Sequence, residues 1–350
     1  MKKIIALALL ACLMLSMVAC GGEEPKKEAE YKLGMGVVVS MDSSKTELAQ
    51  VDATVATVVL DKDGKIVACR IDVAQNKMAV VGGAVDTVAT FETKMELGDR
   101  YGMAGKVDND GNGVMKEWYD QTKAFEAYVV GKTAAEVNSI ETQEAGGHMI
   151  AVDKVLLDAG CSMQITDFIA AVVKACNDEQ AQTFKTAGEF KLGVAAKTTA
   201  EESTAATSDK DGSVKMYTDF AAAVTGADGK ILAALTDAIQ PQIAINTLGE
   251  IVDKSFKDTK RCLKEGYNMA TYGANMDNNG DGKVLEWYVQ ADAYAKYAVG
   301  KTGTELKAMQ IQTLDNGYKI SADKALLDAG CTIQVTGINA VVGAACDNVR

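Results

Sequence analysis

Histidine, proline and tryptophan are scarce in this sequence of 350 residues, which has one histidine, two prolines and two tryptophans. A single histidine, His148, and the absence of any Cys-x-x-Cys motif argue against a Cys/His metal site. No nucleophile–base pair stands out either, so the sequence gives no support for an independent catalytic site. Glycine is plentiful instead, at 32 residues, and indicates many tight turns.

Basic residues are also few relative to acidic ones, 36 against 48, which gives a formal net charge of −12 and a pI near 4.8. Loss of Lys2 and Lys3 with the leader described below makes the charge −14. A field of this sign repels a phosphate backbone, so we expect no nucleic-acid partner. The hydrophobic content of 48% is enough to form cores for two domains of ordinary size.

A leader occupies residues 1–19, with a short basic start and an apolar run over residues 4–18. This run is too short to span a bilayer and suits the core of a signal peptide. It ends at Ala19, directly before Cys20, and the segment resembles a bacterial lipoprotein signal. The resemblance implies that Cys20 carries a diacylglycerol and anchors the chain on the extracytoplasmic face of the cell membrane. Residues 20–30 then form a charged tether.

Eight cysteines would suggest disulfides in an exported protein. Cys12 lies in the leader and Cys20 is the expected lipidation site. Four of the others recur as equivalent pairs in the two halves of the chain: Cys161 and Cys176, then Cys331 and Cys346. We expect buried free thiols, and the alternative is one disulfide in each repeat.

Two stretches, residues 156–176 and 326–346, are identical at 12 of 21 positions. Further matches occur in the same order along both halves: Tyr31-Lys-Leu-Gly34 with Phe190-Lys-Leu-Gly193, Asp72 and Gln75 with Asp237 and Gln240, Thr93-Lys94 with Thr259-Lys260, Tyr101 and Met103 with Tyr267 and Met269, and Glu117-Trp-Tyr119 with Glu286-Trp-Tyr288. A repeat this long indicates a duplicated domain. We predict domain 1 over residues 31–183 and domain 2 over residues 187–350, with a boundary in the polar stretch 177–188.

Local patterns predict an α+β fold with an antiparallel sheet and packed helices in each domain. Residues 51–60 are rich in β-branched side chains, and Asp63-Gly64 is a hairpin signal before a second strand at 66–73. Apolar spacing of three and four predicts an amphipathic helix over 117–130, and Thr133 is expected to cap a short helix after it. The repeated stretches are expected to begin as apolar strands, with Thr166 and Thr336 capping a closing helix.

Two other repeated motifs have simpler explanations than ligand binding. The Gly-Lys-Thr triplets at 131–133 and 300–302 lack the earlier glycine of a P-loop and suit a helix end, a turn and an N-cap. The loops at 108–113 and 277–282 match the first half of an EF-hand, but Tyr119 and Tyr288 stand where its bidentate acid belongs. Calcium binding and a plain Asx-rich loop both stay open, so the metal content is unknown.

Polar and aromatic residues elsewhere in the repeats allow two interpretations. Asp72-x-x-Gln75 follows a predicted strand and suits either a solvated strand end or contact with a polar ring edge. The equivalent tryptophans, Trp118 and Trp287, suit either the core face of a helix or the wall of a flavin site.

The turns at Gly160-Cys161-Ser162 and Gly330-Cys331-Thr332 are the strongest functional signal. A glycine can adopt a positive φ and lets the backbone approach a ligand closely. The start of the following helix directs N–H groups toward an anion. A hydroxyl between the two is a suitable tether for a phosphate, and the alternative is a turn that the fold needs for closure.

Together these residues resemble the bacterial FMN-binding domain family, most closely its flavinylated, pheromone-type lipoproteins of extracellular electron transfer. In that family a flavin transferase joins FMN to a Thr or Ser hydroxyl within a Ser-Gly-Ala-Thr motif. Gly160-Cys161-Ser162 and Gly330-Cys331-Thr332 match its last three positions, with Cys in place of Ala. The resemblance implies two tandem FMN-binding-like domains, with Thr332 and Ser162 as covalent FMN sites, Gly330 and Gly160 beside them, and one or two FMN per chain.

The resemblance further implies a membrane-anchored electron carrier rather than a stand-alone enzyme. Electrons would pass from a membrane quinone-linked donor, through covalent FMN, to an extracellular acceptor. The alternative is a non-redox surface lipoprotein whose duplicated domains bind a ligand or peptide. A leader that yields a signalling peptide is a third possibility.

Overall fold

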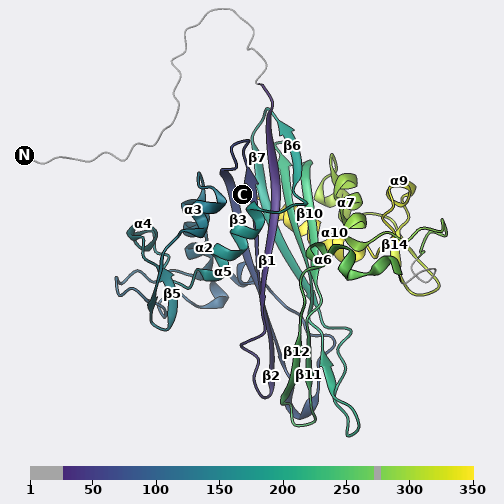
Figure 1. The fold of residues 1–350 in the computed structure, drawn as a ribbon, viewed down its shortest axis with the longest axis horizontal. Coiled ribbons are helices and arrows are strands. Elements are labelled where there is room, and N and C mark those ends of the chain that lie inside the picture. The colour runs from purple at the N-terminus through teal and green to yellow at the C-terminus, as the bar shows by residue number, and fades with distance from the viewer. Residues whose placement is uncertain (1–26, 272–276) are drawn as a thin grey trace, which may run out of the picture.

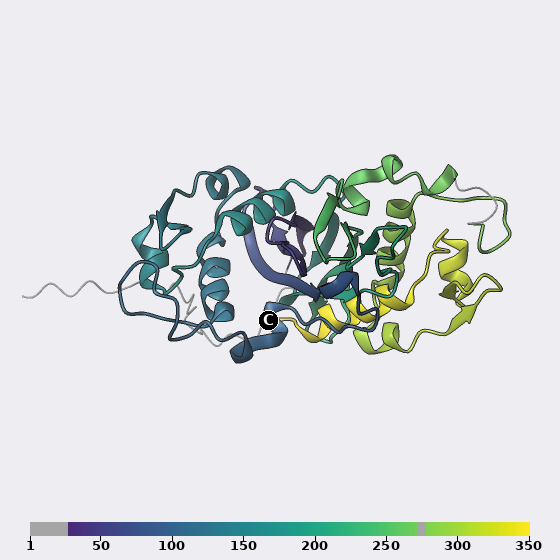
Figure 2. The same cartoon turned by 90° about the horizontal axis from the view of Figure 1, so that it is seen from below.

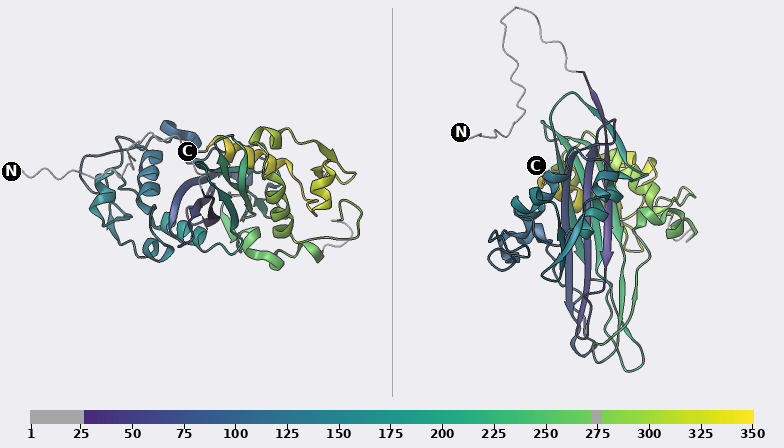
Figure 3. Two further views of the ribbon diagram at one scale, coloured as in Figure 1. Left: turned by 90° about the horizontal axis from the view of Figure 1, so that it is seen from above. Right: turned by 60° about the vertical axis from the view of Figure 1, so that its left-hand side comes forward.

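The computed structural model describes residues 27–271 and 277–350, and it is an α+β fold built mainly from antiparallel strands. Two sheets lie face to face in the centre, and a group of helices covers the outer face of each sheet (Figure 1). The two helical groups lie at opposite ends of the molecule in the views from below and above (Figures 2 and 3). The leader and Cys20 lie outside the described residues.

The first sheet has the strand order β3-β2-β1-β6. Its strands are β1 (Ala29–Ser40), β2 (Leu48–Leu60), β3 (Ile66–Ala79) and β6 (Gln182–Thr186). Side chains of β2 are buried on both faces, since one face meets the second sheet and the other meets helices. This double burial explains the apolar, β-branched composition from which the strand was predicted. The hairpin at Gly64, with φ 74°, is also confirmed.

Short helices and one hairpin follow β3 and precede the closing helix of the first half. These elements are η1 (Val81–Gly83), α1 (Lys94–Leu97), η2 (Gly98–Tyr101), α2 (Trp118–Val129), α3 (Ala134–Asn138), β4 (Thr142–Ala145), β5 (His148–Ala151), α4 (Lys154–Asp158) and α5 (Thr166–Cys176). The predicted helix at 117–130 is confirmed as α2, and Thr133 caps α3 as expected. Helix α5 packs on β1 and β2.

The second half repeats this succession of elements. Its sheet has the order β10-β9-β7, the equivalent of β3-β2-β1. Its elements are β7 (Phe190–Thr199), β9 (Tyr217–Gly226), β10 (Ile231–Ile239), α6 (Lys260–Leu263), η3 (Lys264–Tyr267), α7 (Trp287–Ala298), α8 (Gly303–Lys307), β13 (Ile311–Thr313), β14 (Lys319–Ser321), α9 (Lys324–Asp328) and α10 (Thr336–Asp347).

One apolar core joins the halves, because the inner faces of the two sheets pack against each other. Val55 and Val59 of β2 belong to the same buried cluster as Phe220 and Val224 of β9. Strand β6, which lies within the predicted boundary stretch 177–188, pairs with β1. Its Gln182 side chain also accepts a hydrogen bond from the Ala234 amide of β10, at 3.3 Å. The connecting segment is therefore part of the sandwich.

A third sheet extends the sandwich at the end far from the start of β1 (Figure 1). It consists of β8 (Gly212–Val214), β11 (Gln242–Ile245) and β12 (Ile251–Ser255), in the order β12-β11-β8. Backbone hydrogen bonds join it to the first half, from Glu47 N–H to the Gly249 carbonyl oxygen at 2.8 Å and from Ala206 N–H to the Gly83 carbonyl oxygen at 2.9 Å.

Two local predictions in the repeated stretches are wrong. The apolar start of each stretch is a short helix, α4 or α9, rather than a strand. Asp153 caps α4 by accepting from Val155 N–H at 2.9 Å, and only Leu156 of its residues is buried. Thr166 and Thr336 are the first residues of α5 and α10 and not their caps. In α5, Ile165 takes the cap position because its N–H is bound to the Met149 carbonyl oxygen of β5.

Candidate functional site

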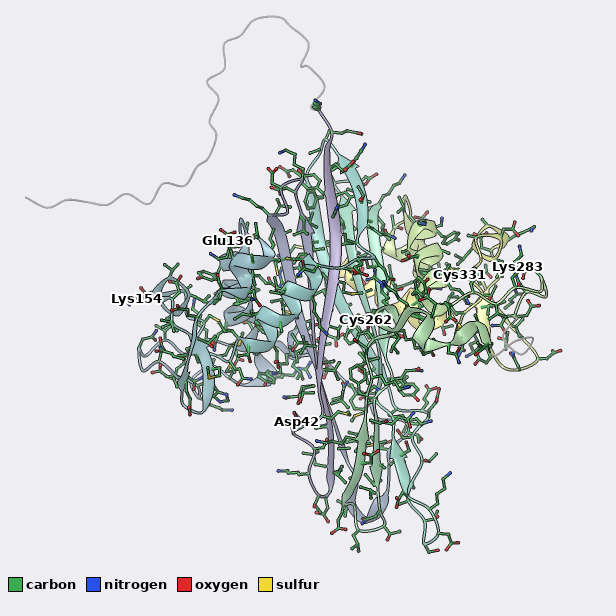
Figure 4. All side chains as sticks on the ribbon, in the orientation of Figure 1. Asp42, Glu136, Lys154, Cys262, Lys283 and Cys331 are labelled. Atoms are coloured by element: carbon green, nitrogen blue, oxygen red, sulfur yellow. The ribbon has the colours of Figure 1, made fainter. Side chains whose placement is uncertain are left out.

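The loops at 160–162 and 330–332 each connect a short helix to a closing helix. Gly160 and Gly330 have φ of 86° and 89°, so both positions use the conformation that only glycine adopts easily. The side chains of Lys116 and Leu285 lie over the two glycines. Cys331 is fully buried in the helical layer of the second half (Figure 4), as Cys161 is in the first.

The two predicted attachment hydroxyls are buried. Ser162 is 1% exposed and Thr332 is 5% exposed. Ser162 Oγ has no hydrogen-bond partner within the part of the chain that the structure describes. Thr332 Oγ1 donates to Gln290 Oε1 at 3.2 Å. A buried hydroxyl without a partner costs about 1–3 kcal/mol, so Ser162 is an energetically unfavourable residue unless a further group bonds to it.

A buried glutamine holds each loop in place. Gln121 Oε1 accepts from the N–H groups of Ser162 and Met163, both at 3.0 Å, and its Nε2 donates to the Lys116 carbonyl oxygen at 2.9 Å. In the second half, Gln290 Oε1 accepts from Thr332 N–H at 2.8 Å. These glutamines occupy equivalent positions, four residues after Glu117 and Glu286. Their only signal in the sequence is that both repeats have a glutamine at this place, and no role was predicted for them.

A cavity of about 410 Å³ lies beside the Ser162 loop in the first half. Its volume is within the range of small-molecule sites. Aromatic side chains, polar side chains and residues of the loop itself form its wall. Among them are Tyr101, Trp118, Phe168, Gln75, Asn109, Met163 and Gln164. Ser162 does not line the cavity, but Asn109 Nδ2 donates to the Ser162 carbonyl oxygen at 2.8 Å and so connects the cavity wall to the loop.

Several residues that the repeats brought to notice converge on this cavity. Trp118 and Gln75 line it, as do Tyr101 and Met103. Trp118 is 2% exposed and packs edge-on against Phe168, with ring centroids 5.9 Å apart. It is therefore both a core residue and part of the cavity wall. His148 also lines the cavity, and sequence reasoning gave it no such role.

A lysine also occupies the cavity wall. Lys94 Nζ lies 4.9 Å from the ring centroid of Tyr101 and 5.6 Å from that of Trp118. The equivalent Lys260 lies 4.9 Å and 5.3 Å from the ring centroids of Tyr267 and Trp287. Such distances allow a cation–π interaction with both rings. The matching Thr-Lys pairs are visible in the sequence, but nothing in the sequence indicates that the lysines contact these rings.

A buried carboxyl group beneath each lysine fixes the start of its helix. Asp72 Oδ1 accepts from Met95 N–H at 3.2 Å, and Asp237 Oδ1 accepts from Arg261 N–H at 3.0 Å. Burial raises the pKa of Asp72 to about 6, and burial has the same effect on the pKa of Asp237. The two residues of the Asp72-x-x-Gln75 motif thus have different roles. Asp72 holds the start of α1, and Gln75 lines the cavity.

The Asx-rich loops show the geometry of turns. Asp108 accepts from the N–H groups of Asn112 and Gly113, at 3.1 and 3.0 Å. Glu117 is not available to a cation in the same loop, because its carboxylate accepts from the N–H groups of Met103 and Ala104. Among the described residues, no group of three or more His, Cys, Asp or Glu side chains could hold a metal ion.

The cysteines provide no redox pair in the described ranges. All six cysteines there are free, namely Cys69, Cys161, Cys176, Cys262, Cys331 and Cys346. The prediction of buried free thiols is therefore confirmed for Cys69, Cys161 and Cys331, while Cys176 and Cys346 are half-buried and Cys262 is exposed. The alternative of one disulfide in each repeat is wrong for the described residues. Burial raises the pKa of both Cys161 and Cys331 to about 12, so both thiols stay protonated and unreactive at neutral pH.

Comparison of the chain with protein-family models, with curated proteins and with solved structures gave no match in any of the three. In residues 27–271 and 277–350, no helix has the length and apolar character needed to cross a membrane. The resemblance to FMN-binding domains therefore remains a prediction from the sequence.

Proposed function

We propose that this chain is an electron carrier that holds FMN covalently at Ser162 and Thr332, and that a lipid at Cys20 anchors it outside the cell. The observation that carries the proposal is the unpartnered, buried Ser162 hydroxyl beside a cavity with aromatic and polar walls. The same loop, glutamine and lysine–tyrosine–tryptophan arrangement recurs in the second half.

The residues around the first cavity fit a phosphate-linked aromatic ligand. Tyr101, Trp118 and Phe168 give it flat apolar walls, while Gln75 and Gln164 can bond a polar ring edge. The Ser162 hydroxyl lacks a hydrogen-bond partner among the described residues, which fits an oxygen that ends as a phosphoester. When bound, a flavin supplies reversible electron transfer, and the protein contributes orientation and charge.

Burial of both hydroxyls has a consequence for attachment. A transferase that joins FMN from FAD to Ser162, with release of AMP, needs access to the hydroxyl. The loop at 160–164 must therefore open, or the attachment must precede its closure. Burial also favours an alternative, in which the cavity binds its ligand without a covalent bond.

Intact mass and visible absorbance of the exported protein, co-expressed with a flavin transferase, test the proposal. We expect two added FMN units on the unsubstituted chain, with one lost in Ser162→Ala and one lost in Thr332→Ala. Thr166→Ala is the matched control, because Thr166 lies four residues from Ser162 and makes no side-chain cap. It should keep both units.

Other outcomes contradict parts of the proposal. A single unit that is lost only in Thr332→Ala would make the first half a structural partner. No added mass, with a transferase shown to be active on another substrate, would overturn covalent attachment. In that case the better explanation of the cavity is the alternative function, a non-redox surface lipoprotein whose duplicated domains bind a ligand or peptide.

A further inference from the structure

The lysines at the start of α1 and α6 have a fixed position in each half. Lys94 follows the buried Thr93, whose hydroxyl oxygen accepts from Glu96 N–H, while the Glu96 carboxylate accepts from Thr93 N–H. The Asp72 carboxylate binds the next residue, Met95, from the sheet. Thr259 caps α6 in the same way by accepting from Cys262 N–H at 3.3 Å. Both lysines thus project from a backbone that the sheet holds in place.

Each ammonium group is directed toward the two aromatic rings rather than away from the protein. Lys94 and Lys260 are half-buried, with a Tyr and a Trp ring centroid within 6 Å of each Nζ. A cation held against rings, partly removed from water, acts over a longer range than a solvated one. In the first half this cation is part of the cavity wall.

A carboxylate faces the lysine in both halves, but it comes from different elements. In the first half it is Asp167, in the first turn of α5, which lines the same cavity as Lys94; burial raises the pKa of Asp167 and the nearby Lys94 ammonium opposes that effect. The equivalent position in α10 is Gly337. In the second half the carboxylate is Asp219 of β9, at the position that Thr54 holds in β2.

In the second half, Asp219 occupies the space that an acidic side chain at position 337 would fill. A Cβ atom on Gly337 would lie 2.4 Å from Asp219 Oδ2, so the carboxylate sits directly against the start of α10. The nearby Lys260 ammonium opposes the effect of burial, which raises the pKa of Asp219. In the first half, Thr54 leaves that place free and also lines the cavity.

Both halves therefore keep a lysine, two aromatic rings and one acid close together, although the acid comes from a different position in each half. The lysine, tyrosine and tryptophan are identical, and one acid completes the group from the helix or from the strand. A partly buried lysine needs an acid for charge balance whether or not a ligand binds. The place of Lys94 in the cavity wall is the observation that directs its charge toward a ligand.

We propose that Lys94 sets the electron affinity of the ring bound in the first half, by stabilising its reduced, anionic form. This inference rests on the proposed function. A quinone-linked donor gives two electrons and one proton to the ring and releases its second proton to solvent, which leaves one negative charge on the ring. The lysine keeps its own proton and balances that charge.

The test uses the full chain with Thr332→Ala, so that only the first half carries flavin. Lys94→Met should lower the equilibrium constant for reduction of the flavin at least tenfold. For a two-electron couple, a tenfold change lowers the midpoint potential by about 30 mV. Lys94→Arg should retain most of the potential. Lys123→Met is the matched control, because Lys123 Nζ lies 4.6 Å from the Tyr119 ring centroid on the same helical layer, outside the cavity wall. Spectroelectrochemistry reads the potential independently of any electron-transfer rate.

A shift below threefold in Lys94→Met, or an equal shift in Lys123→Met, overturns the inference while leaving the proposed function intact. Failure of flavin attachment, seen by mass, contradicts the proposed function separately. The same variants without covalent flavin are then titrated anaerobically with reduced and with oxidised riboflavin, which lacks the phosphate, and binding is followed by quenching of tryptophan fluorescence. A loss of affinity in Lys94→Met alone that is at least tenfold larger for the reduced form than for the oxidised form supports a lysine that acts on the reduced ring. An unchanged ratio of the two affinities, or no binding to the unsubstituted chain, overturns it.

Discussion

The Arg350 guanidinium binds the buried carboxylate of Glu126, with Nη2–Oε distances of 2.8 and 2.9 Å, and so joins the end of the second half to helix α2 of the first. Arg70 supports the pair, since it donates to the Arg350 carbonyl oxygen and lies 3.7 Å from Glu126. A corresponding pair, Arg261 with Asp178, ties the first closing segment to α6 at 3.1 Å. The halves thus exchange ion pairs near each closing helix.

We expect Arg350→Ala to destabilise the protein by about 2–3 kcal/mol, because it leaves the buried Glu126 carboxylate with only the Ile71 N–H and the more distant Arg70 as partners. Chemical denaturation measures the change. In the double variant with Glu126→Gln the loss should be smaller than the sum of the single losses. Strict additivity would show that the two side chains do not interact.

Glycines in the repeated Lys-Leu-Gly motifs allow each closing helix to approach its sheet. A Cβ atom on Gly34 would lie 2.1 Å from the Ala175 carbonyl oxygen, and one on Gly193 would lie 1.9 Å from that of Ala345. We expect Gly34→Ala and Gly193→Ala each to cost about 2–3 kcal/mol of unfolding free energy through overpacking. Gly188→Ala is the control, since its nearest neighbour would be 3.8 Å away. A control that loses as much stability as the others would contradict the packing explanation.

The raised pKa of Asp72, about 6 because of burial, makes stability depend on pH. Between about pH 4 and pH 6 the folded chain keeps a proton that the unfolded chain has released. The stability that comes from this retained proton is therefore fully present below pH 4 and is lost as pH rises toward 6. As pH rises from 4 to 7, the free energy of unfolding of Asp72→Asn should increase by about 2 kcal/mol relative to that of the unsubstituted chain. Thermal or denaturant unfolding at several pH values measures it, and a difference between the two chains that stays constant from pH 4 to pH 7 would contradict the explanation.

Replacement of Gln121 should loosen the loop that carries Ser162. Gln121→Ala leaves the buried N–H groups of Ser162 and Met163 without their acceptor, which we expect to cost about 2–4 kcal/mol. Hydrogen exchange at residues 160–164 should rise more than exchange in the central strands. Uniformly faster exchange throughout the chain would indicate global destabilisation instead. Gln290→Ala provides the equivalent test for the Thr332 loop.

Much of the fold could be predicted because the sequence repeats its local signals. The β-branched run of β2, the Asp63-Gly64 turn and the Thr133 cap each depend on residues a few positions apart. Alternation and capping are local effects, so they act before any tertiary contact forms. The short helix α4 was missed, because a short apolar run does not by itself distinguish a strand from a helix, and the capping Asp153 was not considered.

The sequence alone determined that the chain is duplicated, that it is α+β, and that hydroxyls and aromatic residues recur at matching places. Only the tertiary structure decided which of them meet. Gln75, Lys94, Trp118 and Phe168 are far apart along the chain and share one cavity because strand β3 and helices α1, α2 and α5 converge there. The replacement of the helix acid, Asp167, by the strand acid, Asp219, was equally invisible, because residues far apart in the sequence become neighbours only when the strand packs against the helix.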